Sequence, residues 1–137
     1  MTTIILYYSL SGKTKTLAEK QAAETGADVI EVREVKPHKG FSAFIPGCCQ
    51  AMALKSSAIV PLETDLSAYD EIVIMGPIWA GKPAPAVNSI IGLLPAGKTV
   101  SLHCTAGSGE ANLSKTAALI TEKGCTVKET LCHNTKE

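Results

Sequence analysis

Hydrophobic residues along this chain fall into two kinds of segment, compact apolar runs and segments with helical spacing. Two runs, Thr3–Tyr8 and Glu71–Met75, are almost continuously apolar, which is typical of strands buried on both faces of a sheet, and Lys98–Cys104 is predicted as a third inner strand. Two others, Val29–Val35 and Cys125–Cys132, carry charged residues within the run, and this pattern favours strands at the edges of a sheet. The sequence therefore predicts three inner strands and two edge strands.

Helical spacing, with apolar residues three or four positions apart, occurs in three segments between these strands. The first follows the turn-like stretch "SLSGKT", with Ser11 as the expected N-cap and Gly26 as its end. The second begins near Pro83 and Pro85, and the third is Glu110–Lys123. Their expected buried faces carry, in turn, Leu17, Ala18, Gln21 and Ala22; Val87, Ile90, Ile91 and Leu94; and Leu113, Thr116, Ala117 and Ile120.

The order of these elements predicts the fold class. Strands that alternate with helices favour an α/β fold with a parallel sheet, right-handed crossovers and helices on both faces. With 137 residues and neither a linker nor an internal repeat, we expect a single domain over residues 1–137. The least regular part is Pro37–Ile59, where we expect loop and a short helix in "CCQAMALKSSA". Sheets of this kind bind ligands beyond the carboxyl ends of their strands, so the candidate site lies there.

Composition and charge restrict the classes of function. Thirteen basic residues balance thirteen acidic ones, so the chain has no net charge to attract nucleic acid or an anionic membrane. No apolar stretch reaches the roughly 20 residues that a membrane-spanning helix needs, and "MTTIILYYSL" lacks the basic region of a secretory signal. The five cysteines are odd in number and contain no CxxC pair, so we expect reduced thiols in the cytoplasm.

Three short polar or glycine-rich loops follow the predicted inner strands and would meet at one edge of the sheet. The first, "SLSGKT", places hydroxyl groups and a glycine at a helix N-terminus, where backbone N–H groups favour a phosphate. The second, "GPIWAGKPAP", holds the single tryptophan of the chain, a suitable wall for a planar heterocycle. The third, "TAGSGE", allows a backbone to approach a flat ligand closely. A simple capped helix and a packed tryptophan are the structural alternatives for the first two.

The stretch "LHCTAGSGEAN" also has the beginning of the phosphate-binding loop of a cysteine phosphatase. Such an enzyme needs an arginine after the five residues that follow its nucleophilic cysteine, in order to hold two phosphate oxygens. Glu110 stands at that position, and its charge would repel a phosphate dianion. We therefore interpret Cys104 as the end of a buried strand, His103 as an ordinary strand residue and Glu110 as an acid in the first turn of the next helix.

Taken together, the three loops resemble the flavodoxin family. The stretches that carry the resemblance are "YYSLSGKTKTLAE", "YDEIVIMGPIWAGKPAPAV" and "GKTVSLHCTAGSGEAN", and the resemblance extends from about residue 3 to about residue 131. It implies a three-layer α/β flavodoxin-like fold with a five-stranded parallel sheet in the order 2-1-3-4-5, and FMN as the cofactor.

Carried to this sequence, the resemblance implies three groups of contacts with FMN and assigns neither a catalytic residue nor a metal ligand. The phosphate would be bound by Ser9, Ser11, Gly12, Lys13 and Thr14. One side of the isoalloxazine ring would be bordered by Pro77, Ile78, Trp79, Ala80 and Gly81. The other edge of the ring would meet the backbone of Thr105, Ala106, Gly107 and Gly109.

The chain differs from the family pattern at three places. Lys13 replaces a common asparagine and adds positive charge near the phosphate, and Ala80 replaces a frequent second aromatic residue. Six residues follow Leu131, fewer than the ~11 residues of an ordinary helix, so we expect no fifth helix. Because the first and fifth helices share a face in this family, we expect an uncovered apolar patch there and a homodimer that closes it.

The predicted function is that of an FMN-binding redox protein of flavodoxin type. It would either carry electrons between partner proteins or take hydride from NAD(P)H and reduce a small acceptor such as a quinone. An open ring face favours the reductase, whereas the lack of an insertion that could bind nicotinamide favours the carrier. The alternative from another class is a flavodoxin fold without flavin that serves as an interaction module.

Overall fold

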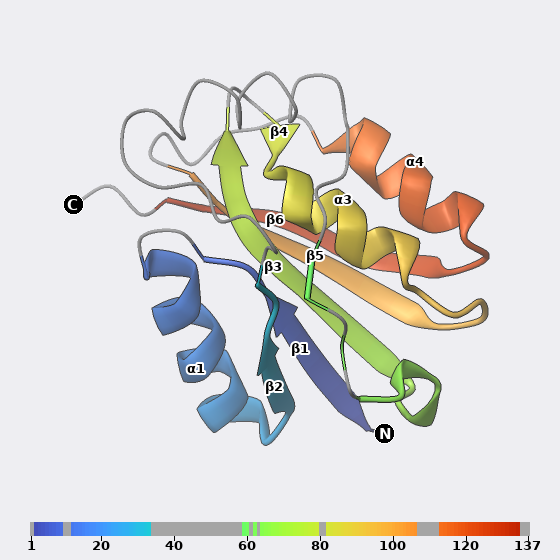
Figure 1. The fold of residues 1–137 in the computed structure, drawn as a ribbon, viewed down its shortest axis with the longest axis horizontal. Helices are drawn as coiled ribbons and strands as arrows, with labels where there is room; N and C mark the ends of the chain where they lie inside the picture. Colours follow the sequence, from blue (N-terminus) through green and yellow to red (C-terminus); the bar gives the residue numbers. More distant parts are fainter. Residues whose placement is uncertain are drawn as a thin grey trace.

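A parallel β-sheet forms the middle layer of the molecule (Figure 1). The computed structural model describes residues 2–9, 12–33, 59, 60, 62, 64–79, 82–106 and 113–134, and gives only the backbone at 79, 82, 106 and 134. Five strands pair in parallel in the order β2-β1-β3-β5-β6. Their bounds are β1 Thr3–Tyr7, β2 Asp28–Glu31, β3 Glu71–Trp79, β5 Thr99–Ala106 and β6 Thr126–Asn134. The predicted order 2-1-3-4-5, with two edge strands, is confirmed.

Helices cover both faces of this sheet, as the alternation of elements predicts. Helix α1, Lys13–Thr25, packs on one face, while α3, Pro85–Gly92, and α4, Ser114–Glu122, pack on the other (Figure 1). A short 3₁₀ helix, η1, spans Leu66–Ala68 before β3. The described part of the chain contains no helix that is both long and apolar enough to cross a membrane.

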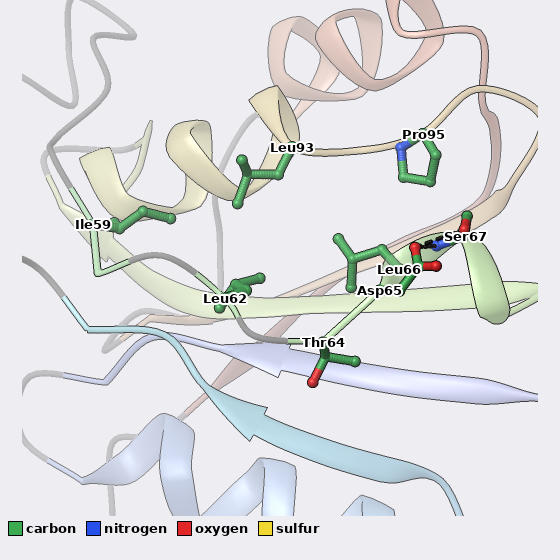
Figure 2. Close-up of a pocket in the computed structure, with 8 residues that line it drawn as sticks. All are labelled: Ile59, Leu62, Thr64, Asp65, Leu66, Ser67, Leu93 and Pro95. Carbon is green, nitrogen blue, oxygen red and sulfur yellow. Dashed lines mark hydrogen bonds between the residues drawn. The ribbon is translucent and has the colours of Figure 1, made fainter.

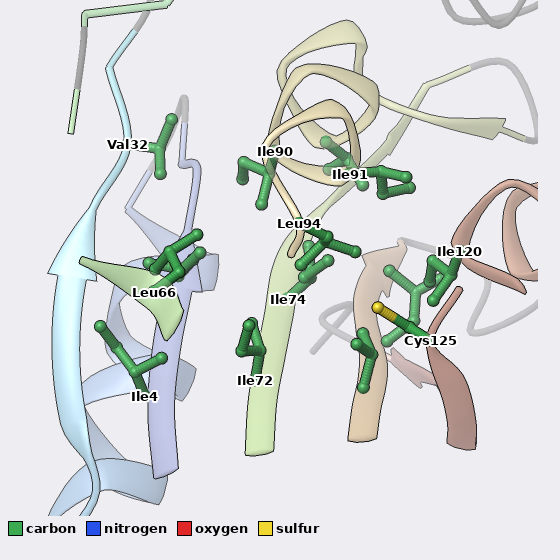
Figure 3. Packing of buried hydrophobic residues seen from close by; sticks show 14 of the residues in the cluster. Ile4, Val32, Leu66, Ile72, Ile74, Ile90, Ile91, Leu94, Ile120 and Cys125 are labelled. Carbon is green, nitrogen blue, oxygen red and sulfur yellow. The ribbon is translucent and has the colours of Figure 1, made fainter. Parts of the chain in front are cut away.

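Alternate residues of the inner strands form the main core on the face of α3 and α4 (Figure 3). The predicted apolar face of α3 is buried there, because successive turns place its members on one side of the helix. The buried members from the strands, the two helices and the residues next to the helix ends are Ile4, Leu6, Ile72, Ile74, Val100, Leu102, Cys104, Val87, Ile90, Ile91, Leu94, Leu113 and Ile120. A smaller core beneath α1 is formed by Ile5, Tyr7, Ala18, Val73 and Met75.

Several predicted element boundaries are wrong by a few residues. The second inner strand does not end at Met75, because β3 continues through Gly76 and Pro77 to Trp79 and pairs there with β4, Lys82–Pro83. The first edge strand is shorter than predicted, and the third inner strand extends two residues beyond Cys104. The last helix begins at Ser114 rather than Glu110, which lies outside the described residues. The expected loop and short helix of Pro37–Ile59 lie outside them as well, up to residue 58.

The α1 face of the sheet changes from apolar to polar on passing from β3 to β5 and β6. One extra residue, Lys128, lies in β6 between the partners of Val100 and Ser101. This bulge sets the register of the following residues, so the neighbours across the two strands are Ser101 and Glu129, His103 and Leu131, and Thr105 and His133. A cleft of about 330 Å³ lies here between α1 and β6.

These side chains bear on the expected homodimer. Of the described residues of β5 and β6 on this face, Leu131 is the large apolar side chain that is exposed, at 41%. Ser101 is buried, and its hydroxyl has no hydrogen-bond partner among the described residues. The described residues of β5 and β6 therefore do not form the expected apolar patch on this face, and the homodimer stays a prediction.

Candidate functional site

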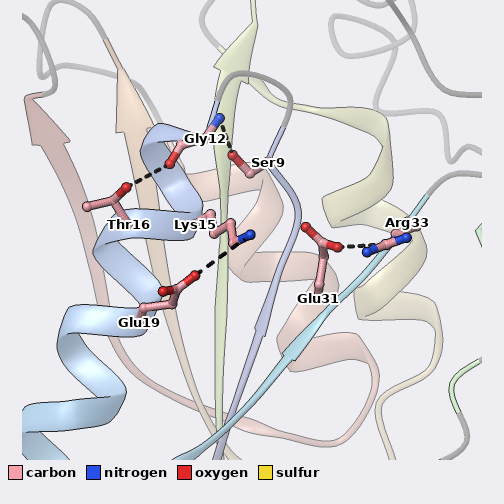
Figure 4. Close-up of polar contacts among 7 residues, drawn as sticks. All are labelled: Ser9, Gly12, Lys15, Thr16, Glu19, Glu31 and Arg33. Atoms are coloured by element: carbon pink, nitrogen blue, oxygen red, sulfur yellow. Dashed lines mark hydrogen bonds and ion pairs between the residues drawn. The ribbon is translucent and has the colours of Figure 1, made fainter.

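The loop after β1 ends at the N-terminus of α1 on a glycine. Gly12 stands at the N-cap with φ 96°, a left-handed conformation that a residue with a side chain rarely adopts. The predicted N-cap, Ser11, is therefore wrong by one position, although Ser11 itself lies outside the described residues. The Gly12 N–H donates to the Ser9 hydroxyl at 2.9 Å and closes the turn (Figure 4). Within the described residues no side chain caps the helix, so no described side chain competes with a ligand for its first N–H groups.

The charges near this helix end are compatible with an anion. The first turn of α1 contains no acidic residue, and Lys13 is exposed there. The nearby carboxylates have cationic partners: Glu19 pairs with Lys15 at 4.0 Å, and Glu31 pairs with Arg33 at 2.6 Å (Figure 4). An anion at the helix end would thus meet the positive end of the helix dipole and the Lys13 ammonium group.

The loop after the second inner strand is a small β-hairpin. Strand β4 runs antiparallel to the end of β3, with Ile78 opposite Pro83 and Trp79 opposite Lys82. The Ala84 N–H donates to the Pro77 carbonyl at 2.9 Å and fixes the base of the hairpin to the start of α3. Trp79 is thereby placed at the far end of β3, at the carboxyl edge of the sheet.

Gly76 permits this hairpin to lie against α3. A Cβ atom at Gly76 would lie 2.3 Å from Cγ2 of Val87, which is fully buried in α3. No real Cβ atom tolerates such a distance, so the close approach of β3 and α3 requires a glycine. The glycine of "GPIW" therefore has a packing role beneath the loop.

A buried hydrogen bond joins the first and third loops. The Thr14 and Thr105 hydroxyl groups are 2.8 Å apart, and both residues are at most 5% exposed. Thr14 lies in the first turn of α1 and Thr105 near the end of β5, 91 residues later. This contact brings two of the predicted FMN-binding segments together. It also gives the Thr14 hydroxyl a protein partner that the sequence pattern did not reveal.

The predicted site residues that the structure describes all lie at this one edge of the sheet. They are Ser9, Gly12, Lys13 and Thr14 at the start of α1, Pro77, Ile78 and Trp79 on β3, and Thr105 and Ala106 on β5. Ser11, Ala80, Gly81, Gly107 and Gly109 lie outside the described residues.

Comparisons with known proteins agree with this arrangement. No protein-family model and no curated protein matches the chain. A flavoprotein of Lactobacillus acidophilus, solved in complex with FMN, superposes with a TM-score of 0.80 at 25% identity, over 96% of this chain and 92% of that one. A candidate flavoprotein of Bacteroides eggerthii superposes with a TM-score of 0.80 at 23% identity, over 99% and 90%. The flavodoxin of Megasphaera elsdenii does so with a TM-score of 0.63 at 21% identity, over 98% and 88%. This chain has the flavodoxin-like fold.

In this flavodoxin-like chain, three polar side chains that the sequence analysis missed contact one another on the α1 face of the sheet: His103, Glu129 and His133. His103 is 5% exposed, and its Nε2 lies 3.0 Å from Oε1 of Glu129. Its Nδ1 lies 3.5 Å from Nε2 of His133, and the two rings are tilted by 38°. A carboxylate only accepts, so the His103 Nε2–H would donate to Glu129 and the His133 Nε2–H to Nδ1 of His103. Both contacts are therefore satisfied by neutral rings that carry their protons on Nε2. His103 is thus more than the ordinary strand residue that we expected, and only the β6 register brings its partners together.

Acidification should destabilise the folded chain through His133. Burial and the neighbouring His103 lower the pKa of His133 below its ordinary value of 6.5, while Glu129 opposes this shift. As the pH falls below 6.5 the unfolded chain takes up the proton first, so the free energy of unfolding decreases until the folded pKa is passed. We expect the urea midpoint to drop between pH 7.5 and pH 5.5, and to drop less in His133→Gln. Equal drops in both proteins would contradict this assignment.

An apolar groove of about 440 Å³ lies on the α3 side of the sheet (Figure 2). It is lined by Ile59, Leu62, Thr64, Asp65, Leu66, Ser67, Leu93 and Pro95. Ser67 and Pro95 lie near the amino ends of β3 and β5, whereas Ile59 packs against Tyr8 and Ala84 toward the carboxyl edge. No predicted FMN-binding residue lines the groove.

Proposed function

We propose that the chain binds FMN at the carboxyl edge of its sheet and works as a redox protein of flavodoxin type. The observation that carries the proposal is the Gly12-capped N-terminus of α1, held beside the end of β5 by the contact between Thr14 and Thr105. The FMN complex of the Lactobacillus acidophilus flavoprotein, which shares this fold, supports the same cofactor here.

The residues at the start of α1 fit the phosphate of FMN. Unpaired backbone N–H groups at a helix N-terminus bind phosphate well, and the helix dipole favours its charge. A Cβ at Gly12 would have no described atom within 4 Å, so the space beside the turn is open on the described side. The Ser9 hydroxyl keeps the turn closed, and Lys13 adds a positive charge.

The residues of β3 and β5 fit the other parts of the cofactor. The hairpin after Gly76 holds Pro77, Ile78 and the backbone of Trp79 at the sheet edge, where an apolar wall for a flat ring is needed. Thr105 lies opposite Pro77 in the β3–β5 ladder, so these two segments flank the same space. When bound, FMN supplies the capacity to accept and return electrons. The chain supplies orientation and the surroundings of the ring.

An FMN titration tests the proposal. We expect FMN to bind one to one with quenching of its fluorescence, and riboflavin, which lacks the phosphate, to bind about 30-fold more weakly, because an anion at a helix N-terminus gains up to about 2 kcal/mol. Lys13→Glu should weaken FMN binding by about tenfold at low salt and leave riboflavin binding unchanged.

Lys20→Glu is the matched control for this titration. It makes the same change of charge on the exposed surface of α1, about 10 Å further along the helix, and should leave FMN affinity within about twofold of the original protein. A chain that neither quenches FMN fluorescence nor gains its visible spectrum would overturn the proposal and favour the interaction module. Equal affinities for FMN and riboflavin would show that the N-terminus of α1 does not bind the phosphate.

One further assay separates the two kinds of redox protein. The FMN-loaded chain is mixed with NADH or NADPH, with and without a quinone, and oxidation of the nicotinamide is followed by absorbance. Sustained oxidation that depends on the quinone would favour a reductase. Reduction of the bound flavin by an electron-donating protein, without oxidation of NADH or NADPH, would favour a carrier.

A further inference from the structure

Two cysteines occupy neighbouring positions at the carboxyl ends of β5 and β6. Cys104 and Cys132 are direct partners in the parallel ladder between these strands. Neighbouring strands lie about 4.8 Å apart, and disulfides join residues whose Cα atoms are roughly 4.4 to 6.8 Å apart. Because side chains alternate along a strand, both lie on the face of the sheet opposite His103, Glu129 and His133. The backbone spacing is thus within the range that a disulfide requires.

The two thiols differ in their access to solvent. Cys104 is fully buried among the residues of the main core, whereas Cys132 is half-buried. Burial and, next, the charge of the nearby Cys132 raise the pKa of Cys104 to about 12. Cys104 is therefore protonated at neutral pH and shielded from oxidants in solution, and Cys132 is the thiol that an oxidant reaches first.

We propose that Cys104 and Cys132 form a thiol pair that a hydroperoxide oxidises to a disulfide between β5 and β6. The proposal rests on the ladder register and on the difference in burial, and does not depend on FMN. It gives the chain a modification site one residue before Thr105 and His133, the next partners along the same two strands.

The reaction takes place in two steps. The Cys132 sulfur attacks the outer oxygen of the hydroperoxide, the O–O bond breaks, and Cys132 becomes a sulfenic acid while an alcohol or water leaves. The Cys104 sulfur then attacks the Cys132 sulfur, an S–S bond forms, and the sulfenic oxygen leaves as water with the Cys104 proton. Two electrons pass from the thiols to the hydroperoxide. Because Cys104 is a weakly acidic thiol, the second step should be slow.

The experiment uses a full-length chain in which Cys48, Cys49 and Cys125 are replaced by serine, so that two thiols remain. Cys125 donates to the Pro95 carbonyl at 3.1 Å, and serine preserves a donor there. After treatment with hydrogen peroxide under native conditions, we expect the intact mass to fall by the two hydrogens of a disulfide, about 2 Da, and both thiols to be lost to Ellman's reagent. Dithiothreitol should restore both.

The single changes separate the two steps. With Cys104→Ser added, Cys132 should form a sulfenic acid that dimedone labels, with no loss of mass; with Cys132→Ser added, neither reaction should occur at Cys104. A gain of oxygen atoms, about 16 Da each, in the two-thiol chain without the 2 Da loss would overturn the proposal, as would a disulfide-linked dimer.

The unaltered protein provides a second measurement that does not depend on folding of the variant. After peroxide treatment, blocking of thiols and trypsin digestion, we expect a linked pair of peptides, residues 99–115 joined to residues 129–136, which carry Cys104 and Cys132. The peptide 124–128, which carries Cys125, should remain unlinked and is the internal control. Absence of the 99–115 to 129–136 link would contradict the proposal.

Discussion

Replacing Gly76 with alanine is expected to lower the free energy of unfolding by about 3 kcal/mol, at the upper end of the usual cost of overpacking a core. The new Cβ would lie 2.3 Å from Cγ2 of Val87. Val87 is fully buried in α3, and a β-branched side chain in a helix has one strongly preferred rotamer. The clash can therefore be relieved only by separating β3 from α3.

A double-mutant cycle with Val87→Ala makes this prediction specific. Val87→Ala alone should cost roughly 2 kcal/mol, because it leaves a cavity in the main core. Together with Gly76→Ala it removes the clashing atom. The double variant should therefore lose at least about 1 kcal/mol less unfolding free energy than the two single variants lose in sum. Strictly additive urea-unfolding energies would show that the two positions do not clash.

Gly92→Ala is the control for the cycle. Gly92 is exposed at the end of α3, and a Cβ there would have no described atom within 4 Å. Because alanine favours a helix more than glycine does, this variant should be unchanged or more stable by up to about 1 kcal/mol. The contrast between Gly76, which packs against α3, and Gly92, where a Cβ meets no described atom, would separate packing effects from backbone effects.

Thr105→Val should lower the free energy of unfolding by about 1–3 kcal/mol, since it leaves the buried Thr14 hydroxyl without its partner. Thr14→Val should cost a similar amount for the same reason. The double variant Thr14→Val with Thr105→Val removes both polar groups, and should therefore be clearly more stable than the sum of the two changes predicts. Chemical denaturation of the four proteins measures the coupling.

Thr121→Val is the control for these threonine variants. Thr121 is exposed in α4, and its hydroxyl donates to the Ala117 carbonyl within the same helix at 3.1 Å. The same exchange of a hydroxyl for a methyl should change stability there by no more than about 0.5 kcal/mol. A loss at Thr121 equal to that at Thr105 would assign the effect to helix or strand preference instead of to the buried contact.

The local pattern of the sequence was sufficient to predict the layers of this fold. Continuous apolar runs identified the first two inner strands, β1 and β3, because both of their faces are buried, and charged residues identified the two edge strands. Spacing of three and four identified Val87, Ile90 and Ile91 on the buried face of α3, and the buried Leu94 just after its end. The three loops that resemble the flavodoxin family follow three neighbouring strands, so their meeting at one edge followed from strand order alone.

Element ends and side-chain partners were decided by the tertiary structure. The sequence favoured an end to the second inner strand at Gly76 and Pro77, yet β3 continues because β4 and β5 provide hydrogen-bond partners on its two sides. Likewise, Ser11 was the expected helix cap, but the turn closes on the Ser9 hydroxyl and leaves Gly12 at the helix end.

The sequence by itself determined the order of the elements and much of the buried face of α3, because burial imposes a period on neighbouring residues, although of the predicted buried face of α1 only Ala18 is fully buried. Only the tertiary structure decided the pairs: Thr14 with Thr105, His103 with Glu129 and His133, and Cys104 with Cys132. The members of these pairs are separated by 26 to 91 residues, and their meeting depends on strand register. One extra residue, Lys128, sets that register in β6, and no local period reveals where a bulge will be accommodated.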